Sequence, residues 1–268
     1  MDNMRADQLL VERGLAASRS QAQRLIAAGA RWRSREGWRP LAKSDDLPPQ
    51  AEIELLDAAE ARYVSRGGLK LEGALRDAGL DVRGWRCLDL GQSTGGFTDC
   101  LLQHGAAQVT GVDVGHGQLH PRLAQDVRVR ALEGINARAL DTTKIIADSA
   151  CSTRTGCQFD AKFDLVVADL SFISLTLVLP GLAPLLKPGG HLLLLVKPQF
   201  ELQPADIGKG GIVRDAASFA AVEARLRAAC AAQGWRVLRW LPSAIAGGDG
   251  NREFFIHAAN AASASSAT

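Results

Sequence analysis

The distribution of apolar and polar positions predicts an α/β fold over most of the chain. From Val64 onward, short apolar runs alternate with longer segments in which apolar residues recur at helical spacing. This alternation is typical of a parallel, doubly wound sheet with helices on its faces. The strands are expected at 86–91, 108–114, 163–170, 191–197, 236–241 and 253–259, and the helices at about 68–79, 97–104, 175–186 and 215–233.

The first sixty residues follow a different pattern, which predicts a small separate domain. The segment RADQLLVERGLAASRSQAQRLIAAGA (5–30) reads as two short helices separated by a glycine. Ser18 and Gln21 have the spacing of a capping box for the second helix, and Gly29 ends it. The segment EIELL (52–56) is expected to close the domain as a strand.

Positive charge is concentrated in this first domain. The whole chain has a net charge of +2, but Arg13 to Lys43 holds eight basic residues and one acidic residue, Glu36. Trp32 and Trp38 are interleaved with these arginines. Arginine and aromatic side chains can hold phosphates and stack on bases, so the segment indicates either a nucleic-acid-binding surface or a solvated polar face.

Composition narrows the class of protein. The five cysteines are odd in number and form no C-x-x-C pair, which favours reduced thiols over a disulfide scaffold or a metal site. The N-terminus has no apolar segment typical of a signal peptide, and the longest apolar run, 192–196, is far below the ~20 residues that span a bilayer. We therefore expect a soluble cytoplasmic protein without a metal. The last residues, ANAASASSAT (259–268), are low in complexity and are expected to be disordered.

A glycine-rich turn follows the first strand of the expected sheet. In DLGQSTGGFTDCLL, the glycines give the spacing G-x-x-x-G-G, whereas dinucleotide sites have G-x-G-x-x-G, so an NAD-linked oxidoreductase is disfavoured. Asp113 ends the second strand, 22 residues after Gly91, where a carboxylate can accept hydrogen bonds from a cofactor ribose. The form D-x-G-x-x-x-G-G resembles the S-adenosylmethionine site of class I methyltransferases more than an NAD site. The segment LLKPGG (185–190), a helix end that turns into the next strand, resembles the same family.

Four charged residues that are far apart in the sequence are expected to meet at one edge of this sheet. Asp169 and Lys197 each end a strand, and the functional edge of an open parallel sheet lies at the carboxyl ends. If the last strand runs antiparallel, as in methyltransferases, Glu253 begins on that edge, and Lys70 starts the helix that leads into the first strand. Each residue alone could be a surface charge or a cap, but Lys197 follows a fully apolar strand.

The chemistry of this set suits the removal of a proton from a ribose 2′-hydroxyl group. A lysine has an ordinary pKa of about 10.4, which desolvation and a neighbouring cation lower towards the working range. We expect Lys197 to be the base and Lys70 to supply the neighbouring charge, while Asp169 and Glu253 fix the geometry. A sulfonium methyl donor is already activated, so the remaining task is positioning.

The order Lys-Asp-Lys-Glu resembles the catalytic tetrad of FtsJ-like ribose 2′-O-methyltransferases. With VSRGGLKLEGAL, ADLSFISL, VKPQFE, GKGGIVRD and GNREFF, the chain resembles the TlyA (haemolysin A) family over nearly its full length. Members of that family join an S4-like RNA-binding domain to an FtsJ-like domain and methylate ribose oxygens of cytidines in ribosomal RNA. This resemblance implies S-adenosylmethionine as the cofactor, and 16S rRNA, 23S rRNA or a ribosomal subunit as the partner.

The resemblance also implies a domain division and site residues. An S4-like α+β domain is expected at 1–62, and a Rossmann-like class I methyltransferase sheet, mostly parallel with an antiparallel last strand, at 63–258. The implied catalytic residues are Lys70, Asp169, Lys197 and Glu253. The implied cofactor-binding residues are Asp89, Gly91, Ser93, Gly95 and Asp113. The implied RNA-binding residues are Arg5, Arg19, Arg24, Arg31 and Arg33.

The chain departs from the family pattern at three places. In the first domain, Ala30-Arg31-Trp32-Arg33 stand where the S4-like domain usually has a strand with alternating valines and an Asn-Gly turn. Gln92 stands where the family usually has a small residue, and SAIAGGDGNREF is an altered approach to Glu253.

The main alternative to the enzyme function is a non-catalytic RNA-binding or assembly factor that retains the methyltransferase fold. A membrane-lytic protein is disfavoured, because no spanning segment and no strongly amphipathic basic helix is visible. The segment IGKGGIVRD (207–215) indicates either a mobile basic loop beside the site or a plain connection.

Overall fold

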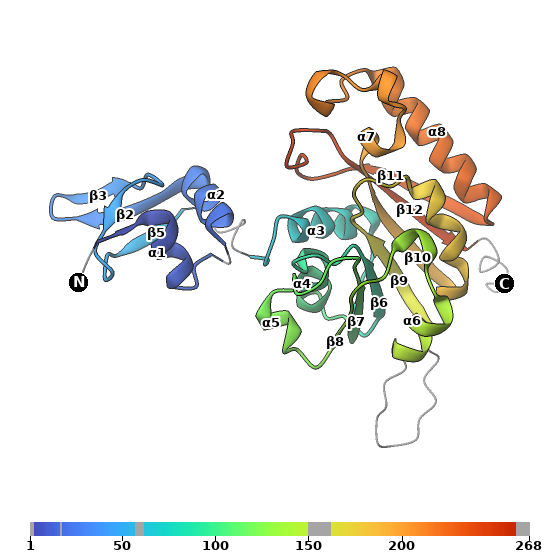
Figure 1. The fold of residues 1–268 in the computed structure, drawn as a ribbon, viewed down its shortest axis with the longest axis horizontal. Coiled ribbons are helices and arrows are strands. Elements are labelled where there is room, and N and C mark those ends of the chain that lie inside the picture. The colour runs from blue at the N-terminus through green and yellow to red at the C-terminus, as the bar shows by residue number, and fades with distance from the viewer. Residues whose placement is uncertain (1–2, 17, 57–61, 150–161, 261–268) are drawn as a thin grey trace. The chain divides into compact units, whose positions relative to one another are not determined.

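The computed structural model describes residues 3–16, 18–56, 62–149 and 162–260 (Figure 1). The chain forms two compact units, Met1–Leu69 and Lys70–Thr268. The division falls within helix α3 (Gly67–Ala78), later in the chain than the boundary expected after residue 62.

The first unit is a small α+β domain. Its elements are β1 (Met4–Arg5), α1 (Ala6–Glu12), α2 (Arg19–Gly29), β2 (Ala30–Ser34), β3 (Gly37–Pro40), β4 (Asp46–Leu47) and β5 (Ile53–Leu55). Strand β2 lies between β3 and β5 in an antiparallel sheet, and β1 pairs with β4. Leu9, Leu10 and Leu25 belong to its buried core. The two predicted helices and the closing strand are confirmed, and Ser18 Oγ caps α2 by accepting a hydrogen bond from the Gln21 amide (3.3 Å).

The second unit is built on a seven-stranded sheet of order β11-β12-β10-β9-β6-β7-β8. Its strands are β6 (Arg86–Leu90), β7 (Gln108–Val112), β8 (Val129–Leu132), β9 (Phe163–Ala168), β10 (Leu186–Val196), β11 (Trp235–Pro242) and β12 (Phe254–Asn260). Strands β8, β7, β6, β9 and β10 are parallel, and β12 is antiparallel to β10 and β11. The predicted Rossmann-like sheet with an antiparallel last strand is confirmed.

Helices cover both faces of this sheet (Figure 1). Besides α3, they are α4 (Gly96–Gln103), α5 (Pro121–Ala124), α6 (Thr142–Ser149), α7 (Pro198–Glu201) and α8 (Ala216–Ala232). Short 3₁₀ turns are η2 (Ala137–Ala139), η3 (Leu175–Leu177), η4 (Leu179–Gly181), η5 (Ala183–Leu185), η6 (Pro204–Asp206) and η7 (Lys209–Gly211). Residues of α6, α8 and η3–η5 share a core with Leu192 and Leu194, while Phe97 of α4 stacks on Phe255 of β12 (ring centroids 6.0 Å apart).

Three expectations about local structure were wrong. The segment 175–186 is not one helix but the three turns η3–η5, because Pro180 and Pro184 cannot donate the backbone hydrogen bonds of a continuous helix. Strand β8 was not predicted, since VRAL at the sheet edge is only partly buried and carries no apolar run. Residues 259–260, expected in the tail, complete β12, and the rest of the predicted tail lies outside the described residues.

The apolar run of β10 is buried on both faces and between two neighbouring strands. Residues Leu192 to Val196 are all buried, with β9 on one side and β12 on the other. A central strand of this kind has no polar face, which explains its unbroken apolar sequence. Pro198 then begins α7, so the strand ends at Val196 and Lys197 stands at its carboxyl end.

Candidate active site

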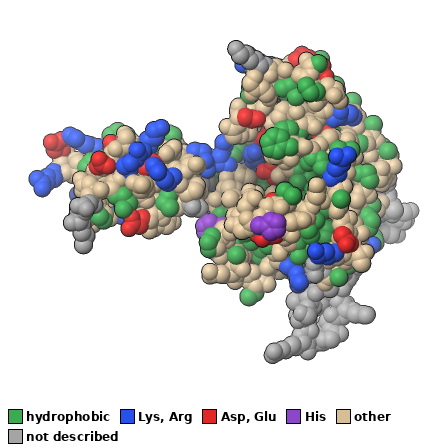
Figure 2. Space-filling model, viewed as in Figure 1, with side chains coloured by type: hydrophobic (Ala, Val, Ile, Leu, Met, Phe, Trp, Pro, Cys, Tyr) green, Lys and Arg blue, Asp and Glu red, His purple; other side chains and the backbone are tan. Residues whose placement is uncertain are grey.

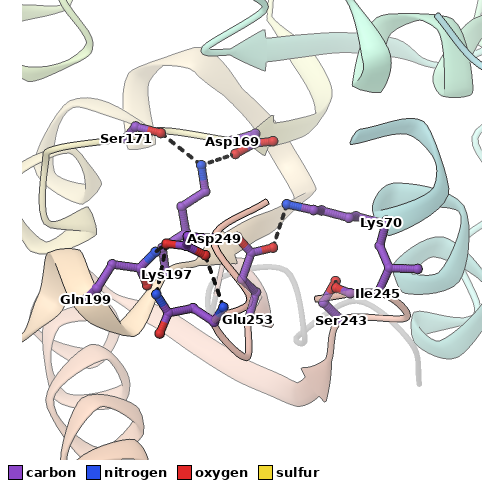
Figure 3. Close-up of polar contacts among 10 residues, drawn as sticks. Lys70, Asp169, Ser171, Lys197, Gln199, Ser243, Ile245, Asp249 and Glu253 are labelled. Atoms are coloured by element: carbon purple, nitrogen blue, oxygen red, sulfur yellow. Dashed lines mark hydrogen bonds and ion pairs between the residues drawn. The ribbon is translucent and has the colours of Figure 1, made fainter. Parts of the chain in front are cut away.

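Lys197 holds its ammonium group between two oxygen atoms of the neighbouring strand's exit (Figure 3). Lys197 Nζ lies 2.5 Å from Asp169 Oδ1 and donates a hydrogen bond to Ser171 Oγ (3.0 Å). The lysine side chain is only 12% exposed. Because β9 and β10 are parallel neighbours, the residues that follow them reach the same edge of the sheet. The buried strand thus leads to a cation that contacts two oxygen atoms.

Lys70 and Glu253 form a second ion pair beside the first one (Figure 3). Lys70 Nζ lies 2.5 Å from Glu253 Oε2, and the two side chains are 9% and 3% exposed. Burial raises the pKa of Glu253, and although the nearby Lys70 and Lys197 oppose this, Asp169 acts in the same direction as burial. The pKa of Glu253 therefore depends on the charges of the three other residues. All four residues predicted from the sequence lie together, and their catalytic role stays a prediction.

A buried asparagine shapes the altered turn that leads to Glu253. Asn251 Oδ1 accepts a hydrogen bond from the Val213 amide (2.9 Å), while its Nδ2 donates to Gly211 O (2.9 Å) and Asp249 Oδ2 (2.8 Å). The segment SAIAGGDGNREF is thereby tied to the end of the 207–215 segment. Its unusual composition is compatible with a fixed position for Glu253.

The glycine-rich turn lies against the end of β9. Gly91 has φ +81°, and a Cβ placed on it would be 2.6 Å from the carbonyl oxygen of Asp169. Ser93 is also left-handed, with φ +46°, and its amide donates a hydrogen bond to Asp113 Oδ2 (2.8 Å). Asp113 Oδ1 accepts from the Gly115 amide (2.7 Å). Asp113 therefore fixes the backbone of the turn from the end of the adjacent strand.

A cavity of about 720 Å³ opens between this turn and the segment after β9. Such a volume is typical of small-molecule and cofactor sites. Two of the predicted cofactor residues, Gly91 and Asp113, line it. So does Ser171, the hydrogen-bond partner of Lys197, which joins the cavity to the charged cluster. The lining also includes Val112, Val114, Ile135, Asn136, Ala137, Arg138, Leu170, Phe172, Ile173, Ser174, Leu177 and Phe200.

Asp89 lies beneath the glycine turn in a buried polar chain. Thr98 Oγ1 donates a hydrogen bond to Asp89 Oδ2 (2.7 Å) and receives one from Gln92 Nε2 (2.9 Å). Within the described parts of the chain, Asp89 Oδ1 has no hydrogen-bond partner. Burial raises the pKa of Asp89 to about 7. Gln92 is turned inward against Gly111, so its side chain does not occupy the cavity.

The comparison with known proteins identifies the family. Residues 63–260 match the FtsJ-like methyltransferase family, and residues 4–30 match the S4 domain. The chain belongs to the FtsJ-like methyltransferase family. It is 41% identical to the 16S/23S rRNA (cytidine-2′-O)-methyltransferase TlyA of Mycobacterium tuberculosis, over 94% of this chain and 88% of that protein. The resemblance to the TlyA family is confirmed.

Two further relatives agree with this membership. YqxC of Bacillus subtilis, provisionally named an rRNA methyltransferase, is 45% identical over 94% of this chain and 84% of that protein. The solved structure of a protein provisionally named a hemolysin, from Streptococcus thermophilus, has a TM-score of 0.70 and 38% identity. That match covers 97% of this chain and 89% of the other.

Four of the five arginines that were predicted to contact RNA in this FtsJ-like methyltransferase pair with carboxylates. Arg5 and Arg19 donate hydrogen bonds to the buried Asp7 (3.2 and 3.0 Å), as does Gln23 (2.8 Å). Burial raises the pKa of Asp7, but these hydrogen bonds outweigh it and hold that pKa well below its usual range. Arg5 and Arg19 remain 44% and 52% exposed, so Asp7 orients them without covering them.

The arginines of strand β2 are arranged on one face of the small sheet. Arg31 Nε donates a hydrogen bond to Glu54 (2.8 Å), and its guanidinium lies over the ring of Trp38 (4.8 Å). Arg33 lies 3.6 Å from Glu52. Arg24, on α2, is half-buried. Figure 2 shows lysine and arginine side chains spread over the surface of this unit. An RNA-binding role for these residues stays a prediction.

Sequence reasoning missed several polar and aromatic residues of the site. Ser171 and Asn251 lie in loops, where no periodic pattern marks a side chain that points inward. Gln199 Nε2 donates a hydrogen bond to Asp249 Oδ2 (3.1 Å) below the lysines (Figure 3). Phe172 is 90% exposed and left-handed, with φ +62°. The available signal for these residues was their place in ADLSFISL, VKPQFE and GNREFF, segments that carry the family resemblance but show no periodic pattern.

The described residues include neither a cluster of metal ligands nor a membrane-spanning helix. Over the described ranges, no group of three or more His, Cys, Asp or Glu side chains is placed to hold a metal ion. In the same ranges, no helix has the length and apolar character required to cross a bilayer.

The raised pKa of Asp89 predicts a pH-dependent stability. The pKa of Asp89 is higher in the folded than in the unfolded protein. The free energy of unfolding therefore falls as pH rises from about 4 to about 7, because over this range the carboxyl group ionises more readily in the unfolded state. Asp89→Asn removes the buried charge and keeps an acceptor for Thr98. The melting temperature of this variant should exceed that of the wild type by a margin that grows over this range and is constant above it. Thermal unfolding at pH 4.5 to 8 measures the margin, with the exposed Asp81→Asn as control; a margin independent of pH contradicts the assignment.

Proposed function

We propose that this protein transfers a methyl group from S-adenosylmethionine to the 2′-hydroxyl group of a cytidine ribose in 16S or 23S ribosomal RNA. The observation that carries the proposal is the pairing of Lys197 with Asp169 and with Ser171, which lines the cavity. The name of the mycobacterial relative, a 16S/23S rRNA (cytidine-2′-O)-methyltransferase, supports the choice of substrate.

The cavity suits S-adenosylmethionine. Gly91 lines the cavity at a point where a Cβ would clash with the carbonyl oxygen of Asp169, and Asp113 stands at the strand end where a ribose can be bound. Val114, Ile135 and Leu170 give the same cavity an apolar lining suited to an adenine ring. The cofactor, when bound, supplies a methyl group already activated on a sulfonium centre.

Lys197 is the residue we assign to proton removal. None of the four charged residues lines the cavity itself, but Ser171, the hydrogen-bond partner of Lys197, does. We therefore take Lys197 as the ammonium group nearer to the reacting atoms. In its neutral form, Nζ can accept the proton of the ribose hydroxyl while Asp169 and Ser171 fix its direction. General bases typically contribute about 10²–10⁴-fold to a rate. The buried ion pair between Lys70 and Glu253 keeps these two side chains in one position beside Lys197 and Asp169.

Two surfaces suit the RNA. The arginines oriented by Asp7 and the Arg31–Trp38 pair can contact phosphates and bases in the first unit. In the second unit, the exposed ring of Phe172 stands at the cavity beside Ser171. Single-stranded bases stack on such aromatic rings, so Phe172 can hold a base next to the ribose that is modified.

The first test concerns Lys197. Lys197→Ala should lower the rate of methyl transfer from labelled S-adenosylmethionine to rRNA by about 10²-fold or more, because the proton acceptor is removed. Affinities for the cofactor and for RNA should be unchanged. Lys187→Ala is a matched control, since Lys187 lies at the other end of β10 and pairs with Asp164. A wild-type protein that binds rRNA and transfers no methyl group to rRNA or ribosomal subunits would support the assembly-factor alternative instead.

The second test concerns Phe172. Base stacking on an aromatic ring is worth about 1–3 kcal/mol, so Phe172→Ala should reduce kcat/KM for RNA by roughly 5- to 150-fold. The dissociation constant of S-adenosylmethionine should change much less. Val127→Ala removes another fully exposed apolar side chain, just before β8, and serves as the control. Equal kcat/KM values for the Phe172 variant and the wild type would exclude a role for this ring.

A further inference from the structure

The segment that carries Ser171 is held from the strand–helix junction that carries Lys197. Lys197 donates to Ser171 Oγ, and Phe200 of α7 contacts Phe172, with ring centroids 4.9 Å apart. Phe172 itself has a left-handed backbone, a conformation that a bulky residue adopts only when its surroundings enforce it. We therefore expect a further contact that holds the backbone of the residues next to Phe172 in place.

Glu201, the last residue of α7, supplies such a restraint. Its Oε1 accepts a hydrogen bond from the Leu175 amide (2.7 Å), and its Oε2 accepts one from Ser174 Oγ (2.7 Å). Arg225 of α8 donates to the same Oε2 (2.6 Å). The carboxylate is buried, yet three donors converge on it. A buried charge with this number of donors is fixed in one geometry.

Resting on the function proposed above, we propose that Glu201 is a positioning residue of methyl transfer. It anchors the far end of the segment 171–175, so that Ser171 meets Lys197 and the exposed Phe172 ring stays at the cavity. Lys197 and Glu201 belong to one short stretch, so the same junction supplies the base and fixes the cavity wall that faces it. Glu201 acts through Ser174 and Leu175 and not on the reacting atoms.

The carboxylate cannot be replaced by its amide without loss of a contact. Glutamine has one acceptor oxygen, and its amide nitrogen carries only donors. In Glu201→Gln, the nitrogen would face a donor whichever way the amide is turned, either the Leu175 amide or the pair formed by Ser174 and Arg225. At least one buried donor would lose its acceptor, and the segment would shift or become mobile.

The link through Arg225 distinguishes this carboxylate from an ordinary helix cap. Helix α8 packs on the sheet through Val222 and Leu226, and Arg225 projects from it to Glu201. The position of the segment 171–175 is thus set by α7 and α8 together. Glu223, on the same helix, makes a comparable ion pair with Arg227, but at the exposed surface.

The first part of the test is independent of activity. Amide hydrogen exchange over residues 170–177 should be faster in Glu201→Gln than in the wild type, most of all at the Leu175 amide. Glu223→Gln makes the same chemical change in another Glu–Arg pair and should leave this exchange unchanged. Unchanged exchange at Leu175 in Glu201→Gln overturns the proposal.

The second part separates positioning from folding. At saturating substrates, Glu201→Gln should lower kcat for methyl transfer to rRNA by about 10- to 100-fold, the effect of a displacement of about 1 Å near reacting groups. The dissociation constant of S-adenosylmethionine should change much less than kcat, because Gly91 and Asp113, which also line the cavity, stay in place. Val222→Ala, which leaves a cavity under α8, should lower the melting temperature and keep kcat at temperatures well below unfolding.

The outcomes distinguish this proposal from the proposed function. A wild-type kcat in Glu201→Gln overturns the positioning role, as does a loss of kcat in Val222→Ala as large as that in Glu201→Gln. A wild-type protein without methyl transfer overturns the proposed function, and hydrogen exchange at Leu175 still decides whether Glu201 holds the segment.

Discussion

The buried charge at the end of β10 is the constraint on which the rest of the site depends. A strand enclosed on both faces and both sides leads directly into Lys197, whose side chain is almost entirely withdrawn from water. An ammonium group in that position is tolerated only when oxygen atoms surround it. Asp169 and Ser171 provide them, and both come from the exit of the adjoining strand. The sheet thus determines where the cation stands and which groups must face it.

Strand register explains why residues so far apart in the sequence meet. Leu194 of β10 is opposite Ala168 of β9, so the residues that follow, Asp169 and Lys197, leave the sheet on the same edge. Val196 is opposite Phe254 of the antiparallel β12, which brings Glu253 to that edge from the other side. Lys70, on the helix before β6, completes the group through its ion pair with Glu253. Family membership adds a reaction to this geometry, since FtsJ-like proteins are methyltransferases.

Site residues could be predicted from the sequence where a clear apolar pattern marked a strand and the topology of parallel sheets fixed the place of its end. The apolar run of β10 ended on a charge, Asp169 ended another run, and parallel strands place their carboxyl ends together, so the charged cluster was predictable. Ser171 and Asn251 were not, because their positions depend on loop conformation, and loops have no periodicity. Glu201 ends the short helix α7, and its partners Ser174 and Leu175 could not be read from the sequence. The helix expected at 175–186 failed since two prolines outweighed a helical apolar pattern. The carboxylate partners of Arg31 and Arg33 also lay beyond sequence reasoning, because the pairing of β2 with β5 had to be known first. The pairing of Arg19 with Asp7 depends on how α1 and α2 pack together.

The central claim is that the edge of this sheet is an active site for ribose methylation and not a structural charge cluster. A map of 2′-O-methylated nucleotides across ribosomal RNA, from cells with and without this protein, tests it most directly. The account predicts that methylation at one or a few cytidines in 16S or 23S rRNA depends on the protein. It also predicts that Lys197→Ala fails to restore these positions, whereas Lys187→Ala restores them. Identical maps with and without the protein would contradict the account.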